Sequence, residues 1–526
     1  MNGDTNILFI MCDQLRWDYL SCYGHPHLQT PNIDGLAARG VQFTRAYCQA
    51  PLCGPSRSSF HTGRYMSSHG AMTNADPIRL GELTLGDCMR ELDVAPVLVG
   101  KMDVTGPRDA LERLGVDADS AVGRAVANGG FEPFEKLEAL YPDPILPPRL
   151  GYNDYLRARG YDGDNPWELY ANSAIGEDGR RASGWQMRHA GLPARVAEAH
   201  SETAFTTDRA IEFLEQTPDD RRWCLHLSYI KPHWPYIAPD PYHALYTRDH
   251  VLPAVRADAE RVNPHPVQRA FMEQDYSGNF SRDEVRERVI PTYMGLIRQV
   301  DDHLGRLLRY LDGRGLTERT LIAFTSDHGD YLGDHWLGEK DLFHDCSARI
   351  PMILCDPSPQ ADATRGTTDD RFVEAVDLLP TFVEFAGGRI RTERVEGRSL
   401  LGLLRGEDVL EWRDFAVSEI DFSDRGPRTL LGVHPWECRA HMLRTDRWKY
   451  VFHERFHPQL FDLDRDPLEL VDLGEAPGYE SVRRGMHERL FAWLRRRRNR
   501  TEMPEGVLFD MGPERDERLG IMIGHW

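Results

Sequence analysis

The chain of 526 residues lacks the positive charge that would tie it to a nucleic acid or to a membrane surface. Its 63 Lys and Arg residues are outnumbered by 83 Asp and Glu residues, and the formal net charge is −20 at pH 7. Such a charge repels the phosphates of nucleic acids and of anionic lipids. The apolar run Ile7 to Cys12 has only the length of a strand, too short to cross a bilayer. We therefore expect no nucleic acid and no membrane as partners.

The sequence also lacks paired cysteines. There are nine cysteines, an odd number, and no two are spaced as C-x-x-C. This spacing gives no indication of a zinc cluster, and the odd number suits a reducing compartment better than a disulfide framework. The first five residues lack the basic segment of a secretory signal peptide. Together these absences predict a cytoplasmic protein.

Strand and helix patterns alternate along the first 100 residues. Asn6 to Cys12 is a nearly continuous apolar run, which is typical of a strand buried on both faces. Thr30-Pro31 and Gly40 mark the start and the end of a helix, and Val41–Tyr47 and Val94–Gly100 follow as strands. This alternation predicts an α/β fold with a mostly parallel sheet sandwiched by helices.

Polar residues follow three of the predicted strands at the point where each strand ends. Asp13 follows the first strand, Lys231-Pro232-His233 follows the strand at 223–229, and Asp327-His328-Gly329 follows the strand at 321–326. In open α/β sheets, ligands bind outside the carboxyl ends of the strands. The three strand ends therefore predict one common site.

The rest of the chain predicts a cover and a second domain. Residues 107–199 have weak periodicity and many aromatics, which favours a packed cover over the site. A long helix around Pro291 follows, with one apolar face. We expect residues 1–410 to form the catalytic α/β domain. We expect residues 411–526 to form a smaller antiparallel α+β subdomain, with strands near 441–443, 448–452 and 460–463 and a helix at 479–498. The apolar end 520–526 is suited to docking on a second copy, which predicts a homo-oligomer.

The most specific signal is Cys53-Gly54-Pro55-Ser56-Arg57, followed by Thr62-Gly63-Arg64. A thiol in front of a helix that Pro55 begins faces unpaired N–H groups and the positive end of the helix dipole. Such a position favours an anion and lowers the pKa of a nucleophile. A cysteine phosphatase loop would need Arg at position 59, where the chain has Ser59. That interpretation fails.

The segment resembles the C-x-P-S-R signature of the type I sulfatase family in the alkaline phosphatase superfamily. Within this family the chain is most similar to phosphonate monoester hydrolases with arylsulfatase activity, and the resemblance covers nearly its whole length. It implies an alkaline phosphatase-like fold and hydrolysis of small anionic sulfate, phosphonate or phosphate esters. It also implies that a formylglycine-generating enzyme oxidises Cys53 to Cα-formylglycine, whose hydrate supplies the nucleophilic oxygen.

A metal site is indicated by Asp13-Gln14 and Asp327-His328. Carboxylate and amide oxygens suit Ca²⁺, Mg²⁺ or Mn²⁺, while an imidazole shifts the preference toward a transition ion. The resemblance matches both pairs to the family's metal ligands, in the Gln and His variants shared with phosphonate hydrolases. It thus implies one divalent ion held by these four residues, with Mn²⁺ favoured and Ca²⁺ next.

Three cationic or proton-donating residues complete the catalytic set. Arg57 lies one turn into the helix of Cys53, where it can brace the nucleophile. The resemblance matches Lys340 to the family's second lysine and His233 to its leaving-group histidine. Lys offers a compact charge for sulfate or phosphonate oxygens, and His can donate a proton to a departing alkoxide.

The chain departs from the family at Gly100-Lys101-Met102-Asp103. The family pattern is G-K-x-H, with the Lys and the His on the sulfate, so Lys101 is kept while Asp103 replaces the His. A carboxylate repels an anionic ester unless it is protonated, paired with Lys101 or used to hold a cationic leaving group. Asn74 matches a polar position near the substrate. Preference between sulfate and phosphonate is therefore left open.

Three alternatives follow from these departures. The chain could be a dedicated aryl- or alkyl-sulfatase. If Cys53 is not oxidised, it could be a metal-dependent esterase that uses bound water. If Asp103 makes the pocket unable to catalyse hydrolysis, the chain could be a non-catalytic anion-binding relative.

Overall fold

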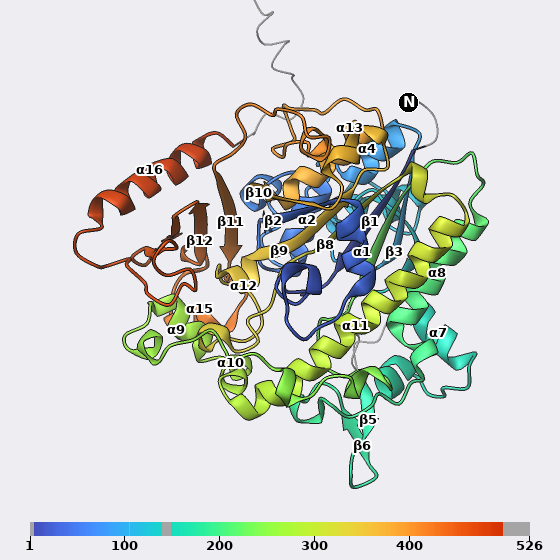
Figure 1. The fold of residues 1–526 in the computed structure, drawn as a ribbon, viewed down its shortest axis with the longest axis horizontal. Helices are drawn as coiled ribbons and strands as arrows, with labels where there is room; N and C mark the ends of the chain where they lie inside the picture. Colours follow the sequence, from blue (N-terminus) through green and yellow to red (C-terminus); the bar gives the residue numbers. More distant parts are fainter. Residues whose placement is uncertain (1–4, 105, 139–148, 498–526) are drawn as a thin grey trace, which may run out of the picture.

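The computed structural model describes residues 5–104, 106–138 and 149–497. An eight-stranded sheet in the order β10-β2-β9-β8-β1-β7-β3-β4 forms its centre (Figure 1). Among these strands β9 alone runs antiparallel to its neighbours. The expected mostly parallel sheet is therefore confirmed. Its strands are β1 (Asn6–Cys12), β2 (Val41–Tyr47), β3 (Ala95–Gly100), β4 (Glu132–Lys136), β7 (Trp223–Tyr229), β8 (Thr320–Ser326), β9 (Arg349–Cys355) and β10 (Thr367–Glu374).

Strand β1 lies in the middle of the sheet, between β7 and β8. All seven of its residues are buried, as its apolar run predicts. The register aligns Cys12 with Tyr229 of β7 and with Ser326 of β8. The residues that follow these three strands therefore emerge side by side at one edge of the sheet, which is the geometry that the sequence predicts for the site.

Helices cover both faces of the sheet because the side chains of β1 alternate between them. Leu8 and Ile10 belong to a core shared with α1 (Pro31–Arg39), α8 (Glu202–Gln216) and α11 (Asp283–Gly313). Phe9 and Met11 belong to the core on the other face, shared with α2 (Cys53–Thr62), α4 (Leu85–Glu91) and α13 (Leu378–Phe385). The long predicted helix is α11, and Pro291 lies inside it.

The segment 107–199 contains more regular structure than its weak periodicity indicates. It supplies edge strand β4 and the hairpin of β5 (Ser173–Ile175) and β6 (Arg181–Ser183). Its helices α5 (Arg108–Arg113), α6 (Ala121–Val126) and α7 (Gly151–Arg157) are too short to show a clear period. The expected aromatic packing is present, because the ring of Tyr152 lies 5.3 Å from Trp167 and 5.2 Å from Phe205.

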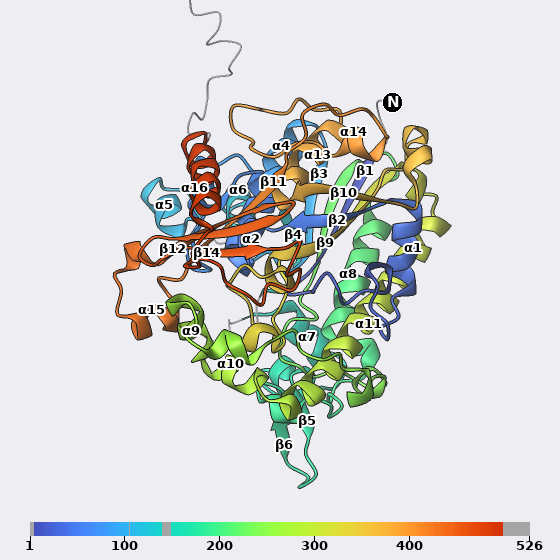
Figure 2. The same cartoon turned by 60° about the vertical axis from the view of Figure 1, so that its left-hand side comes forward.

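The C-terminal part forms a four-stranded antiparallel sheet with a helix beside it (Figure 2). The predicted strands correspond to β12 (Arg439–Thr445), β13 (Trp448–His453) and β14 (Gln459–Asp462), while β11 (Phe415–Asp421) had no prediction. Helix α16 (Glu480–Arg495) packs Met486 and Leu490 on this sheet. The boundary at 410/411 stays a prediction, and the apolar end 520–526 lies outside the described residues.

The remaining helices are short. They are α3 (Met66–His69), α9 (Pro266–Met272), α10 (Asp275–Phe280), α12 (Asp345–Ala348), α14 (Leu401–Leu404) and α15 (Gly426–Leu431). Across the described part of the chain, no helix is both long and apolar enough to span a bilayer.

Candidate active site

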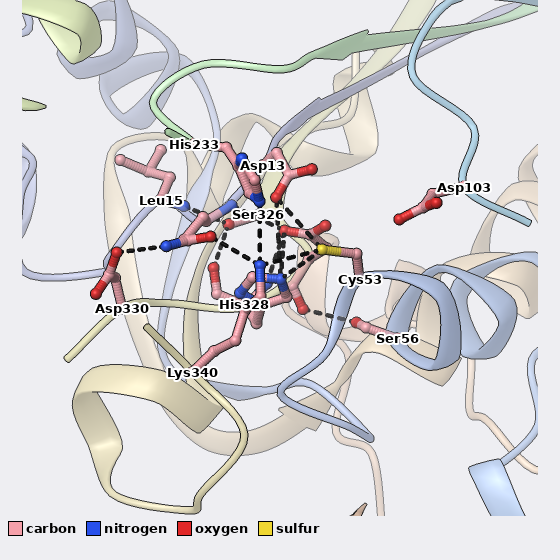
Figure 3. A network of polar contacts seen from close by, with 12 residues as sticks. Asp13, Leu15, Cys53, Ser56, Asp103, His233, Ser326, His328, Asp330 and Lys340 are labelled. Atoms are coloured by element: carbon pink, nitrogen blue, oxygen red, sulfur yellow. Dashed lines mark hydrogen bonds and ion pairs between the residues drawn. The ribbon is translucent and has the colours of Figure 1, made fainter. Parts of the chain in front are cut away.

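Polar side chains converge where β1 and β8 end, opposite the first turn of α2 (Figure 3). Asp13, Asp327 and His328 each offer one ligand atom, and these atoms and the Sγ of Cys53 all lie within 4.8 Å of one another. All four residues are buried. Two carboxylates and an imidazole at such distances fit a divalent cation. The structure thus brings together three of the four predicted metal ligands and the predicted nucleophile.

The fourth predicted ligand, Gln14, is held at the rim of this cluster. Its backbone N–H donates to Asp327 Oδ1 at 3.0 Å, and its Oε1 accepts from Lys340 Nζ at 2.8 Å. Its Nε2 donates to Asp330, and its carbonyl accepts from the hydroxyl of Tyr293 at 2.7 Å. The amide oxygen therefore faces the site. From the sequence we assign Asp330 and Tyr293 no role at the site, although Asp330 directly follows Asp327-His328-Gly329.

Arg57 braces the carboxylates rather than the thiol. Its side chain is fully buried, and its Nε donates to Asp327 Oδ2 at 2.8 Å while Nη2 lies 3.4 Å from Asp13 Oδ2. Nη1 donates to the Lys101 carbonyl at 2.9 Å and to Ser228 Oγ at 2.8 Å. A guanidinium held by four oxygens fixes the orientation of both carboxylates. The expected contact with the nucleophile is thus replaced by contacts with two ligand carboxylates.

Two buried lysines add positive charge on either side of Cys53. Lys101 Nζ contacts Asp13 Oδ2, and Lys340 Nζ lies 3.3 Å from Cys53 Sγ. Burial opposes both charges, but Asp103 and Asp13 outweigh it and raise the pKa of Lys101 well above its usual value. For Lys340, burial is outweighed by Cys53 and nearby carboxylates, so its pKa is also raised. Both side chains are cations at neutral pH.

His233 is oriented by its own loop. Its Nδ1 lies 2.8 Å from the Trp234 carbonyl, which can only accept, so Nδ1 carries the hydrogen. Its Nε2 then accepts from Lys340 Nζ at 3.2 Å. Burial and the charge of Lys340 lower the pKa of His233 well below its usual value. The histidine is therefore neutral, with an ammonium proton next to its Nε2.

Asp103 and Asn74 border the cluster without joining it. Asp103 Oδ2 lies 3.3 Å from Lys101 Nζ, which selects pairing with Lys101 among the three roles that the sequence leaves open. Figure 3 shows Asp103 apart from the converging ligands. Asn74 Oδ1 accepts from the backbone N–H of Gly54 at 2.9 Å. It satisfies one of the unpaired N–H groups at the start of α2 and so helps to position Cys53.

The thiol of Cys53 does not have the lowered pKa that the sequence predicts. Burial and then the charge of Asp13 raise its pKa to about 12, against the opposing effect of Lys101 and Lys340. The prediction was wrong because Cys53 is only 2% exposed, and burial disfavours the charged thiolate. At neutral pH the thiol is protonated, and a protonated thiol is a poor nucleophile.

The arrangement of an α/β sheet, a nucleophile helix and an acidic ligand cluster at the carboxyl edge places the protein among ester hydrolases of the alkaline phosphatase superfamily. A family model described as Sulfatase matches residues 5–388, and one described as N-sulphoglucosamine sulphohydrolase, C-terminal, matches residues 333–496. The chain belongs to the sulfatase family.

Its relatives include proteins that act on phosphorus esters. A multifunctional alkaline phosphatase superfamily protein from Trinickia caryophylli is 31% identical, with 94% of this chain and 96% of the relative covered. The phosphonate monoester hydrolase of Agrobacterium radiobacter has a TM-score of 0.79 at 28% identity, with 93% and 95% of the two chains covered. The phosphonate monoester hydrolase from Silicibacter pomeroyi has a TM-score of 0.82 at 27% identity, with 95% and 96% covered. The chain is thus a hydrolase of sulfate or phosphonate esters.

Proposed function

We propose that this protein hydrolyses both sulfate monoesters and phosphonate or phosphate esters, with a Cα-formylglycine formed from Cys53 and one divalent metal ion. The ion, Mn²⁺ in preference to Ca²⁺, would be held by Asp13, Gln14, Asp327 and His328. One observation carries the proposal: the Sγ of Cys53 lies in the same 4.8 Å cluster as the carboxylates and the imidazole. A nucleophilic oxygen at that atom would lie beside the ligands. The Sulfatase family model supports the sulfate esters, and the two phosphonate monoester hydrolases support the phosphonate esters.

Different residues of the chain would bind the metal ion, bind the ester and orient the metal ligands. When present, the metal ion supplies Lewis-acid charge to the ester oxygens, and the formylglycine hydrate supplies the attacking hydroxyl. Lys101 and Lys340 are buried cations on either side of position 53 and bind the remaining oxygens of the ester. Arg57 keeps Asp13 and Asp327 in their orientation. Burial excludes competing water from these contacts.

His233 and Lys340 together serve the departing oxygen: the Lys340 ammonium carries the proton, and His233 orients that ammonium. His233 Nε2 is within hydrogen-bond distance of the Lys340 ammonium. As the bond from sulfur or phosphorus to the leaving oxygen breaks, that oxygen takes its electron pair and a proton from this pair. The products are an alcohol and the inorganic or organic oxyanion, and one water is consumed per cycle. Asp103 stays paired with Lys101 and sets how strongly that lysine attracts the ester.

The esterase alternative, in which bound water attacks and Cys53 is not oxidised, leaves the thiol without a role. A Cys53 thiol with a raised pKa would block the ligand cluster without acting as a nucleophile. A formylglycine at the same position carries no such penalty, because its hydrate attacks through oxygen. A formylglycine-generating enzyme is therefore the partner that we propose for maturation.

Peptide mass spectrometry across residue 53, combined with paired kinetics, tests the proposal. Active, manganese-supplied protein should carry formylglycine at position 53 and should turn over phenyl sulfate and a phenyl phosphonate monoester. Cys53→Ala should abolish both activities. Cys22→Ala, which alters a half-buried cysteine outside the cluster, should keep them. An intact thiol in fully active protein, or no turnover of either ester by formylglycine-bearing protein, would overturn the proposal.

Two further proposals concern the compartment and the assembly of the protein. We propose that the protein works in the cytoplasm, which is supported by its cysteines: all nine lie in the described ranges and none forms a disulfide. We also propose a homo-oligomer. Cell fractionation tests the first proposal. Light scattering tests the second, and a monomer at micromolar concentration would refute it.

A further inference from the structure

An aromatic path leads away from His233 toward the surface. The ring of Trp234 lies 4.3 Å from that of His233, and the ring of Trp185 lies 5.4 Å from that of Trp234. Trp185 is fixed in place, because its Nε1 donates to Glu168 Oε2 at 2.8 Å. Two ring contacts therefore join the histidine that faces the leaving oxygen to a residue of the segment 107–199.

Trp185 lines a surface cavity of about 800 Å³. One wall comes from the loop that carries Trp185 and Arg188. The other comes from Tyr276 of α10, from Arg282 just before α11 and from Arg288 of α11. A volume of this size suits a drug-sized ligand. The walls combine aromatic rings with guanidinium groups.

Helix α10, which forms one wall of the cavity, packs on the loop of Lys340. The backbone N–H of Gly338, two residues before Lys340, donates to Ser277 Oγ of α10 at 3.1 Å. A Cβ added at Gly338 would lie 2.9 Å from the Tyr276 carbonyl, so this glycine allows α10 to pack closely on the loop. Two wall elements of the cavity, Trp185 and α10, thus contact the segments that carry His233 and Lys340.

The outer part of the cavity is positively charged, in contrast to the whole chain. Three arginines line it against two carboxylates, those of Asp275 and Glu284. Arg282 pairs with Glu284 at 3.7 Å. Within the described residues, Arg188 and Arg288 form no ion pair, and Arg288 Nη1 donates only to the Arg188 carbonyl at 2.7 Å. Two guanidinium groups are therefore available to a ligand, in a chain with a net charge of −20.

We infer that this cavity binds the leaving group, and that it selects a planar aromatic alcohol with an anionic substituent at its far end. The inference rests on the proposed function. Trp185 and Tyr276 would pack on the aromatic ring, and Arg188 and Arg288 would bind the anion. A leaving group with a quaternary ammonium at that position would meet two like charges and be disfavoured. This assigns specificity to residues of the segment 107–199, which shapes one wall.

The test compares three phenyl esters with the same sulfate or phosphonate head. The phenol carries a para-carboxylate, no substituent or a para-trimethylammonium group. Arg188→Glu and Arg288→Glu are measured singly and together, and Arg309→Glu is the matched control. Arg309 lies on the same helix as Arg288, about 30 Å away at 1.5 Å per residue. Differences in intrinsic reactivity between esters cancel when each ratio is compared between variants.

The double variant should lower the ratio of kcat/KM for the carboxylate ester over the trimethylammonium ester by about tenfold. Each exposed ion pair between an arginine and the carboxylate changes kcat/KM by up to a few-fold, mainly through KM. The unsubstituted ester should change by less than about twofold. Arg309→Glu should leave all ratios unchanged. Equal ratios in the double variant and in the control would overturn the inference while the proposed function stood.

A second readout does not depend on turnover. Binding of 4-hydroxybenzoate should quench tryptophan fluorescence, and Trp185→Phe and the double arginine variant should each weaken this binding. If no ester is turned over, the proposed function fails but the binding measurement still decides about the cavity. Unchanged affinity for 4-hydroxybenzoate in both variants would refute the subsite.

Discussion

Lys449 of the C-terminal sheet holds the loop that carries Lys340, and Lys449→Met should destabilise the protein. Its ammonium is 1% exposed, donates to the Phe343 carbonyl at 2.9 Å and to Asp345 Oδ1 at 2.7 Å, and contacts Glu469. Methionine keeps the length and the apolar stem but leaves the carboxylate of Glu469, 3% exposed, without its cation.

The expected loss follows from the partners that remain. Breaking a buried ion pair by removing one member costs about 3 to 5 kcal/mol. Asp345 is 27% exposed and keeps its bond from the Tyr47 hydroxyl at 3.0 Å, so the low end of this range applies. Unfolding entropy of about 2.1 cal/mol/K per residue gives on the order of 1 kcal/mol/K for this chain, so the melting temperature should fall by about 3 °C.

Thermal melts followed by circular dichroism check this value. Lys136→Met is the control, because Lys136 is 32% exposed in its pair with Glu138 and should cost less than about 1 kcal/mol. Adding Glu469→Gln to Lys449→Met should recover roughly half of the loss, because the unpaired charge is removed. A melting temperature of Lys449→Met equal to that of the control would refute the reasoning.

Three other predictions concern pH, metal and charge. His25 Nδ1 accepts from the N–H groups of His27 and Leu28, and burial lowers the pKa of His25 to about 4. The free energy of unfolding should therefore fall by about 1 to 2 kcal/mol as pH falls from 6.5 to 4, because His25 binds a proton at higher pH in the unfolded chain than in the folded one. Urea unfolding at several pH values measures this fall, and His25→Asn should remove it. Chelation of the metal ion should lower the melting temperature, because an ion at 100 times its Kd stabilises the folded state by about 2.7 kcal/mol. Asp13→Asn should abolish the difference between the melting temperatures with and without Mn²⁺. Asp103→Asn should raise kcat/KM about tenfold for a dianionic phosphate monoester and less for a monoanionic sulfate, because the substitution leaves the charge of Lys101 unpaired. Kinetics on the two esters measure this difference, and an equal effect on both would contradict the prediction.

The sequence predicts the centre of the fold because its signals there are local. The apolar runs of β1, β7 and β8 and the Pro and Gly at the ends of α1 mark those elements without knowledge of the rest. Strands β9, β10 and β11 were missed. In β10, for example, the exposed end Thr367 to Arg371 is polar and resembles a loop.

For the site, the sequence and the family resemblance predict which residues converge but not their environment. The pKa of Cys53 depends on burial by residues hundreds of positions away, so a local argument gave the wrong direction. The cavity beside Trp185 joins Arg188 and Arg288, which are 100 residues apart. No spacing rule relates two such positions. The role of Arg57 was also visible only once both carboxylates were in place.

The order of the strands along the chain also determines when each part of the site is synthesised. Strand β1 acquires its neighbours β7 and β8 late, and 275 residues separate Cys53 from His328. At about 5 to 20 residues per second, a ribosome needs roughly 14 to 55 s to cover that distance. Until then Asp327 and His328, which lie beside the thiol in the folded chain, are missing, so the formylglycine-generating enzyme that we propose would have access to Cys53. In the folded chain Cys53 is only 2% exposed, so under the proposed function its oxidation would have to precede folding around this residue.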